Sequence, residues 1–157
     1  MKKFILISAM AVLLSFSARS QTVIKMEHIY EDAITYLSYH RVLQSDTPQG
    51  HLFSLWGMHK YNDSGDYYDA EYFKANAREM FGFLTTVSEL TAKYRNEENI
   101  LIQTHGVKVK LNTLWNTVIC VYDGEDKVFG YFRIKVWNRM LNDFTAFCDI
   151  NGISYKD

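Results

Sequence analysis

The chain has 157 residues, with 17 basic and 18 acidic side chains and a formal charge of −1. This length suits one domain that can bury a substantial core. The basic surplus that marks most nucleic-acid binders is missing. After residue 20, no apolar run reaches the roughly 18 residues that a membrane-spanning helix needs.

The first 20 residues have the pattern of a cleaved secretory signal peptide. Lys2 and Lys3 form a short positive region, and residues 4–14 are almost wholly apolar. This apolar core is shorter than the roughly 20 residues of a membrane-spanning helix, so the pattern predicts a signal peptide rather than an anchor. We therefore expect export to the periplasm or the medium.

The expected cleavage site follows Ser20. Ala18 and Ser20 are the small residues at positions −3 and −1, and Gln21 would become the new N-terminus. A second site after Ser17 is also allowed by residue size. Removing 20 of the 157 residues leaves 137, a single α+β domain over 21–157, with 14 basic and 18 acidic side chains and a charge of −4.

Aromatic side chains are abundant in the mature chain, which holds all 11 Tyr, the 3 Trp and 8 of the 10 Phe. Such residues suit a stacking surface for sugars or peptides. They also suit the half-buried positions of strands. No aromatic cluster stands apart from the strand pattern, so we interpret them as a β-rich core.

The first half is expected to be mainly strands. Residues 33–43 are rich in Tyr, Thr, Ile and Val and favour a strand, although their period also allows a helix. The segment with Pro48 and Gly50 predicts a loop, and Asn, Asp and Gly in residues 62–66 predict a hairpin turn. Strands are expected on either side of that turn, at 51–61 and 67–73.

The strongest helix signal begins at Asn76. Asn76 is a favourable N-cap, and Glu79 completes a capping box. Apolar residues then recur every three or four positions, as on one face of a helix that ends near Arg95. This face comprises Met80, Leu84, Val87, Leu90 and Tyr94.

The second half repeats this order. Strands are expected at 100–111, 117–122 and 128–136, with an Asp-Gly hairpin turn at 123–126. Asn138 is the expected cap of a final helix that Gly152 terminates. Its apolar face comprises Met140, Leu141, Phe144, Phe147 and Cys148.

These elements predict an α+β fold: an antiparallel sheet of about six strands with two helices packed on one face. Similar Trp, Tyr and Asp positions around the two turns raise the hypothesis of a duplicated βββα unit. A strand-rich unit that ends in a helix resembles the repeats of the Pur-alpha single-strand nucleic-acid binders, which have one more strand. No motif matches, and the charge and the export signal argue against nucleic acid.

Cys120 and Cys148 are the two cysteines, and both fall on apolar faces that we expect to meet in the core. An even count in an exported protein allows one disulfide. The alternative is a pair of buried free thiols that act as small apolar side chains.

Two patterns suggest chemistry but have simpler interpretations. Asp63, Asp66, Asp69 and Glu71 could form a weak calcium site, but their spacing fits no EF-hand loop and suits a solvated turn. Asp63-Ser64-Gly65 resembles the nucleophile segment of chymotrypsin-like proteases over these three residues, and a turn explains it fully.

Zinc-binding spacing is absent among the five histidines, which are His28, His40, His51, His59 and His105. No metal, no cofactor and no catalytic residue is predicted, and the ligand-binding residues stay unassigned. The leading hypothesis is a non-enzymatic exported module that binds a protein, peptide or glycan. The alternative is a small periplasmic hydrolase that uses loop carboxylates or a histidine.

Overall fold

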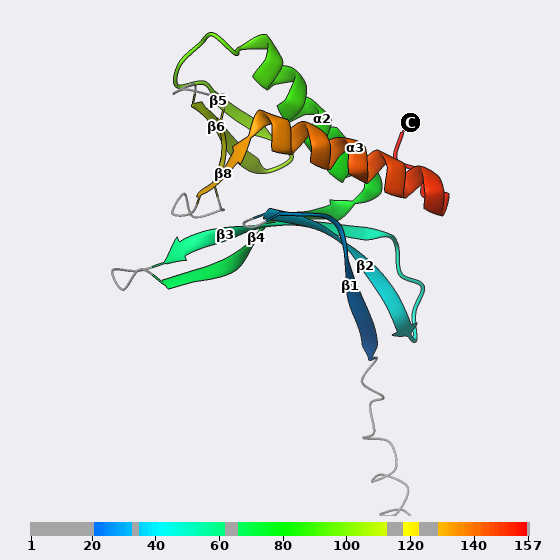
Figure 1. The fold of residues 1–157 in the computed structure, drawn as a ribbon. Helices are drawn as coiled ribbons and strands as arrows, with labels where there is room; N and C mark the ends of the chain where they lie inside the picture. Colours follow the sequence, from blue (N-terminus) through cyan, green and yellow to red (C-terminus); the bar gives the residue numbers. More distant parts are fainter. Residues whose placement is uncertain (1–20, 33–34, 62–65, 113–117, 123–128, 157) are drawn as a thin grey trace, which may run out of the picture.

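The computed structural model describes residues 21–32, 35–61, 66–112, 118–122 and 129–156. In the first half, the described residues form four strands, each antiparallel to the next in chain order, so that β1 and β4 are the edges (Figure 1). This first sheet comprises β1 (Thr22–Glu31), β2 (Thr35–Ser45), β3 (Leu52–Tyr61) and β4 (Asp66–Asn76).

The second half repeats four strands and a helix. The second sheet has the order β5-β6-β7-β8 and is also antiparallel. Its elements are β5 (Leu101–Thr104), β6 (Val107–Asn112), β7 (Val118–Tyr122) and β8 (Phe129–Arg133); α2 (Ala77–Lys93) precedes them and α3 (Ile134–Asn151) follows. The α+β class with antiparallel strands and two helices in the described residues is confirmed.

The sequence predicted one sheet of about six strands. The described residues instead form eight strands, divided into two sheets of four. Each half is therefore a ββββα unit. The β1 strand, which precedes the first strand predicted at 33–43, was not predicted. Residues 100–111 form a hairpin rather than one strand, because His105 and Gly106 take positive φ angles of 50° and 75° and turn the chain between β5 and β6.

The helix boundaries follow local capping. Asn76 and Glu79 form the predicted capping box at the start of α2. The α3 helix begins at Ile134, before the expected cap Asn138, whose side chain instead accepts a 2.6 Å hydrogen bond from Ser88. Gly152 ends α3 in the left-handed conformation, as predicted.

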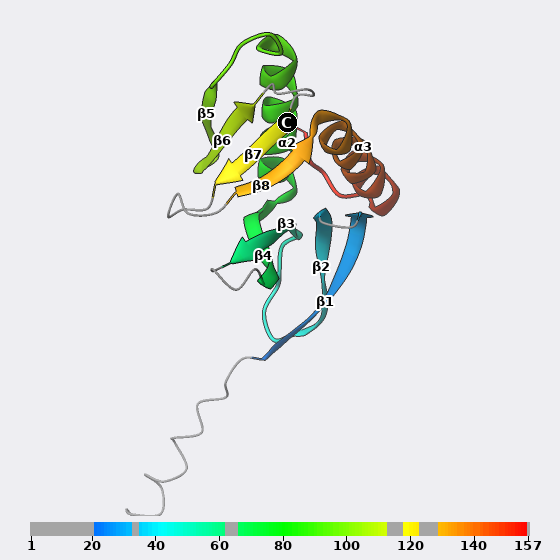
Figure 2. The same cartoon turned by 60° about the vertical axis from the view of Figure 1, so that its left-hand side comes forward.

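The buried apolar residues of the two halves form one core cluster. The two sheets and the two helices that contribute to it can be followed in Figure 2. The α3 helix follows the second sheet but covers the first, where Phe144 packs on Phe53 and Phe147 on Tyr39, with ring centroids 5.0 and 5.2 Å apart. Phe83 of α2 packs against Phe73 of β4 and against His105, in the turn between β5 and β6. Both helices bury a residue at the fourth, seventh, eleventh and fifteenth positions. In α2 these residues are Met80, Phe83, Val87 and Thr91, and in α3 they are Trp137, Met140, Phe144 and Cys148.

Tyr72 fills the junction between the two sheets. Its ring lies over Gly57 of β3 and Gly130 of β8, and it packs edge-on against Phe132. A Cβ atom on Gly130 would lie 2.8 Å from the Tyr72 ring, well inside van der Waals contact. The close approach of β3, β4 and β8 therefore needs glycine at this position.

Candidate functional site

The residues singled out by the sequence lie far apart or outside the described part of the chain. Ala18 and Ser20 of the cleavage site and the turn at 123–126 lie outside the described residues, and Gln21 is the first described residue. Asp63 of the acidic cluster also lies outside them, and Glu71 is the cluster member whose side chain is described. Among the described residues, no three His, Cys, Asp or Glu side chains are grouped as metal ligands would be.

Cys120 and Cys148 are buried free thiols in the structure, on β7 and α3. Burial raises the pKa of Cys120. Burial, together with the charge of Asp149, raises the pKa of Cys148 to about 12. Both groups are therefore protonated and unreactive at neutral pH, which suits packing rather than chemistry.

The surface with the most distinctive chemistry is the side of the first sheet turned away from α3. Leu37, Phe53 and Leu55 point toward the core, so their strand neighbours point the other way. Figure 1 shows α2, α3 and the second sheet on the core side of the first sheet. This outer face comprises Ile24, Met26, His28, Tyr36, Ser38, His40, Val42, Ser54, Trp56, Glu71 and Lys74.

Three rings of the outer face stand in a row across β1, β2 and β3. His28 stacks on Tyr36 with centroids 4.8 Å apart, and Tyr36 stacks on Trp56 at 5.8 Å. The planes deviate from parallel by 12° and 13°. The flat sides of the rings therefore face one another, and the row turns its edges toward solvent.

A short hydrogen-bond chain lies beside the ring row. The Ser54 hydroxyl donates to Glu71 Oε2 at 2.7 Å, and His40 Nε2 lies 2.6 Å from the same hydroxyl oxygen. Ser54 has a single hydroxyl proton and donates it to Glu71. His40 Nε2 must therefore carry a proton and donate it to the Ser54 oxygen. Burial, with a smaller effect of Lys74, lowers the pKa of His40, so this imidazole is neutral at neutral pH.

This chain of hydrogen bonds does not have the arrangement of a Ser-His-acid triad. In a triad the histidine lies between the serine and the acid and accepts the serine proton. Here the serine lies between the other two groups, and Ser54 has no exposed surface. These three residues of the outer face therefore form a hydrogen-bonded network rather than an activated nucleophile.

Two further polar atoms of the outer face are buried without a hydrogen-bond partner among the described residues. They are the Ser38 hydroxyl, on a fully buried side chain, and the indole nitrogen Nε1 of Trp56. Burying a polar group without a partner destabilises a fold by about 1–3 kcal/mol. Such groups mark places where a donor or acceptor from outside the chain would be favourable.

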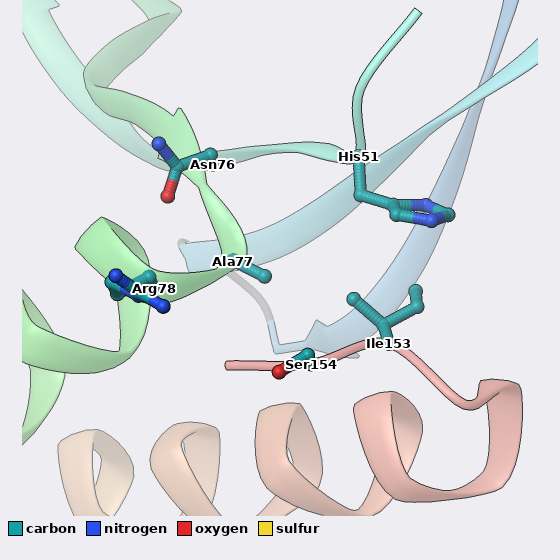
Figure 3. Close-up of a pocket in the computed structure, with 6 residues that line it drawn as sticks. All are labelled: His51, Asn76, Ala77, Arg78, Ile153 and Ser154. Carbon is teal, nitrogen blue, oxygen red and sulfur yellow. The ribbon is translucent and has the colours of Figure 1, made fainter. Parts of the chain in front are cut away.

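A second candidate is an open pocket at the start of α2 (Figure 3). It has a volume of about 340 Å³, and His51 and Arg78 lie on opposite sides of it. The His51 ring is held by the Tyr39 hydroxyl at 2.8 Å. The capping box already places the Glu79 carboxylate at this helix end, so the pocket lacks the open N-terminus of an anion site.

No protein-family model matches the chain, and neither a curated protein nor a solved structure matches it. The resemblance of each unit to Pur-alpha repeats therefore rests on the order of elements alone and carries no function. None of the described helices is long and apolar enough to span a membrane.

Part of the outer face could be predicted from the alternation of residues along β2. Residues 36–42 alternate between the two sides of β2, so Tyr36, Ser38 and His40 share one side. The pairing of Ser38 with Ser54 and of Tyr36 with Trp56 depends on the register between β2 and β3. That register is set across the loop that joins the two strands, and it was not predicted.

Proposed function

We propose that this protein is an exported, non-enzymatic binding module whose ligand surface is the outer face of the first sheet. The observation that carries the proposal is the row of His28, Tyr36 and Trp56 beside exposed Ile24 and Met26. Aromatic residues and Met are enriched at protein interfaces, and an apolar patch bordered by polar groups marks interaction sites.

The ring geometry favours a protein or peptide ligand over a glycan. A sugar packs its C–H face on an open aromatic face, and in this row the ring faces are turned toward each other. Ring edges, Ile24 and Met26 instead suit apolar side chains of a polypeptide.

Selection from a peptide display library, with a glycan array in parallel, tests the proposed ligand class. We expect the protein to enrich peptides with apolar and aromatic side chains, and the variants Tyr36→Ser and Trp56→Ala to lose this binding. Tyr131→Ala is the matched control, because Tyr131 is an exposed aromatic residue on the second sheet. Glycan binding without peptide binding would refute the ligand class.

Two measurements address the rest of the proposal. Sustained turnover of a substrate in a broad hydrolase screen would refute the non-enzymatic function and support the hydrolase alternative. Export predicts that secreted protein begins at Gln21, which N-terminal sequencing or intact mass would verify. A secreted or membrane-bound form that retains residues 4–14 would contradict the cleavage site.

A further inference from the structure

The β1 strand is a long sheet edge. It has ten residues and β4, the other edge of the first sheet, has eleven, whereas the edge strands of the second sheet, β5 and β8, have four and five. The described strands pair with β1 only on its β2 side. A long strand with one unpaired edge is a template for pairing with another chain.

The exposed end of this edge is apolar. Ile24 and Met26 are 45% and 36% exposed, and Val23 beside them is also exposed. Figure 1 shows this part of β1 extending away from α3 together with the end of β2. The core thus leaves these apolar residues to solvent.

The charges next to Met26 are self-complementary. Lys25 precedes Met26 and Glu27 follows it. If two β1 strands pair antiparallel about Met26, Lys25 lies opposite Glu27 of the partner subunit on one side of the joined sheet. On the other side Met26 meets its own copy.

We propose that the protein forms a homodimer by antiparallel pairing of two β1 edges, centred on Met26. The pairing joins the two first sheets into one continuous sheet and places the two outer faces side by side. Lys25 disfavours registers that place it opposite another basic residue, because like charges directly opposite each other across two strands are destabilising. Within one chain, Lys25 Nζ lies 3.9 Å from Glu27 Oε1, the oxygen to which Arg41 donates at 2.7 Å. The contact across the dimer would use the other carboxylate oxygen, Oε2, of the partner's Glu27.

Sedimentation equilibrium or light scattering over a concentration series measures the dimer directly. We expect dimeric wild-type protein, and we expect Lys25→Glu and Glu27→Lys each to raise the dimer dissociation constant about tenfold or more, since each places two like-charge pairs across the interface. Thermal unfolding should show that both variants fold, because Lys25 is exposed and the Glu27–Arg41 pair is an ion pair near the surface, whose loss costs little stability. Lys135→Glu makes the same charge change on α3 and should leave the dimer intact.

A mixture of the two variants gives the deciding result. The Lys25→Glu chain has acidic side chains at both positions, and the Glu27→Lys chain has basic side chains at both. When these two chains pair with each other, both cross-strand contacts regain opposite charges, so a heterodimer should form where neither variant dimerises with itself.

Monomeric wild-type protein at all concentrations, or a dimer that neither variant weakens, would overturn the proposal. Either result is distinguishable from failure of the proposed function, because ligand binding is tested with variants of Tyr36 and Trp56, which lie on β2 and β3.

Discussion

His40 is a residue whose charge state is linked to folding. It is 6% exposed, it donates to Ser54, and its pKa lies below the ordinary 6.5 because of burial and Lys74, despite the opposing effect of Glu71. A proton added to it would be a buried charge next to Lys74. The unfolded chain therefore takes up that proton at a higher pH than the folded chain.

Stability should accordingly be greatest above the unfolded pKa of 6.5 and should fall as the pH drops toward the lower folded value. Urea unfolding at about pH 7.5 and about pH 5.5 measures this difference before most carboxylates titrate. His40→Gln, which keeps a side-chain donor but cannot titrate, should lose much of the pH dependence. If the unfolding free energy of both proteins falls by the same amount between the two pH values, His40 is not the source of the pH dependence.

Substitution of Gly130 tests whether the close contact between the two sheets requires glycine at this position. Gly130→Ala would place a methyl group against the rings of Tyr72 and Phe132, and we expect a loss of about 1–3 kcal/mol in unfolding free energy. Gly50→Ala is the control, because a Cβ there has no neighbour within 4 Å. Chemical denaturation measures both, and equal stabilities would mean that Tyr72 can move aside.

At the scale of elements, α2 combines a packing face with a local cap. Leu84 is fully buried, so Leu84→Ala should reduce the unfolding free energy by about 2–5 kcal/mol. Asn76→Ala removes the acceptor for the Glu79 amide and should cost about 1 kcal/mol. The exposed Glu89→Ala is the control, and a Leu84 effect as small as that control would contradict the buried face.

The β7 strand and the α3 helix each contribute one buried thiol to the core. We expect a thiol-reactive probe to label Cys120 and Cys148 slowly in the native protein, since both are buried and have raised pKa values. After denaturation without reductant, two thiols should react. A denatured protein from the periplasm or medium with no reactive thiol would establish the disulfide alternative.

At the scale of the whole molecule, the position of α3 makes the two halves interdependent. Phe144 and Phe147 of the second half cover Phe53 and Tyr39 of the first. The first sheet would expose this apolar side without them. The protein should therefore unfold in one cooperative transition despite its two similar units.

A fragment of residues 21–95, which contains the first sheet and α2, tests this interdependence. We expect it to lack a cooperative unfolding transition in circular dichroism, whereas the full protein has one. Phe144→Ala in the full protein should cost about 3–5 kcal/mol for the same reason. A stable, cooperatively folded fragment would show that the first unit is an independent domain.

The sequence alone determined the features that depend on neighbouring residues. The Asn76 and Glu79 capping box, the apolar face of α2, the Gly152 helix end and the α+β class are all confirmed. These features arise from side chains a few residues apart, where backbone geometry fixes which side chains meet. The resemblance between the two halves also came from local order, although each half proved to have four strands.

The tertiary structure decided everything that depends on distant residues. The division into two sheets, the placement of α3 on the first sheet and the Ser38–Ser54 and Tyr36–Trp56 pairings join segments separated by loops. The outer face exists only after the β2–β3 register and the covering helix are fixed, because a one-residue shift would turn its residues into the core. Local sequence patterns do not determine the β2–β3 register or the position of the covering helix. Both depend on how the whole core packs.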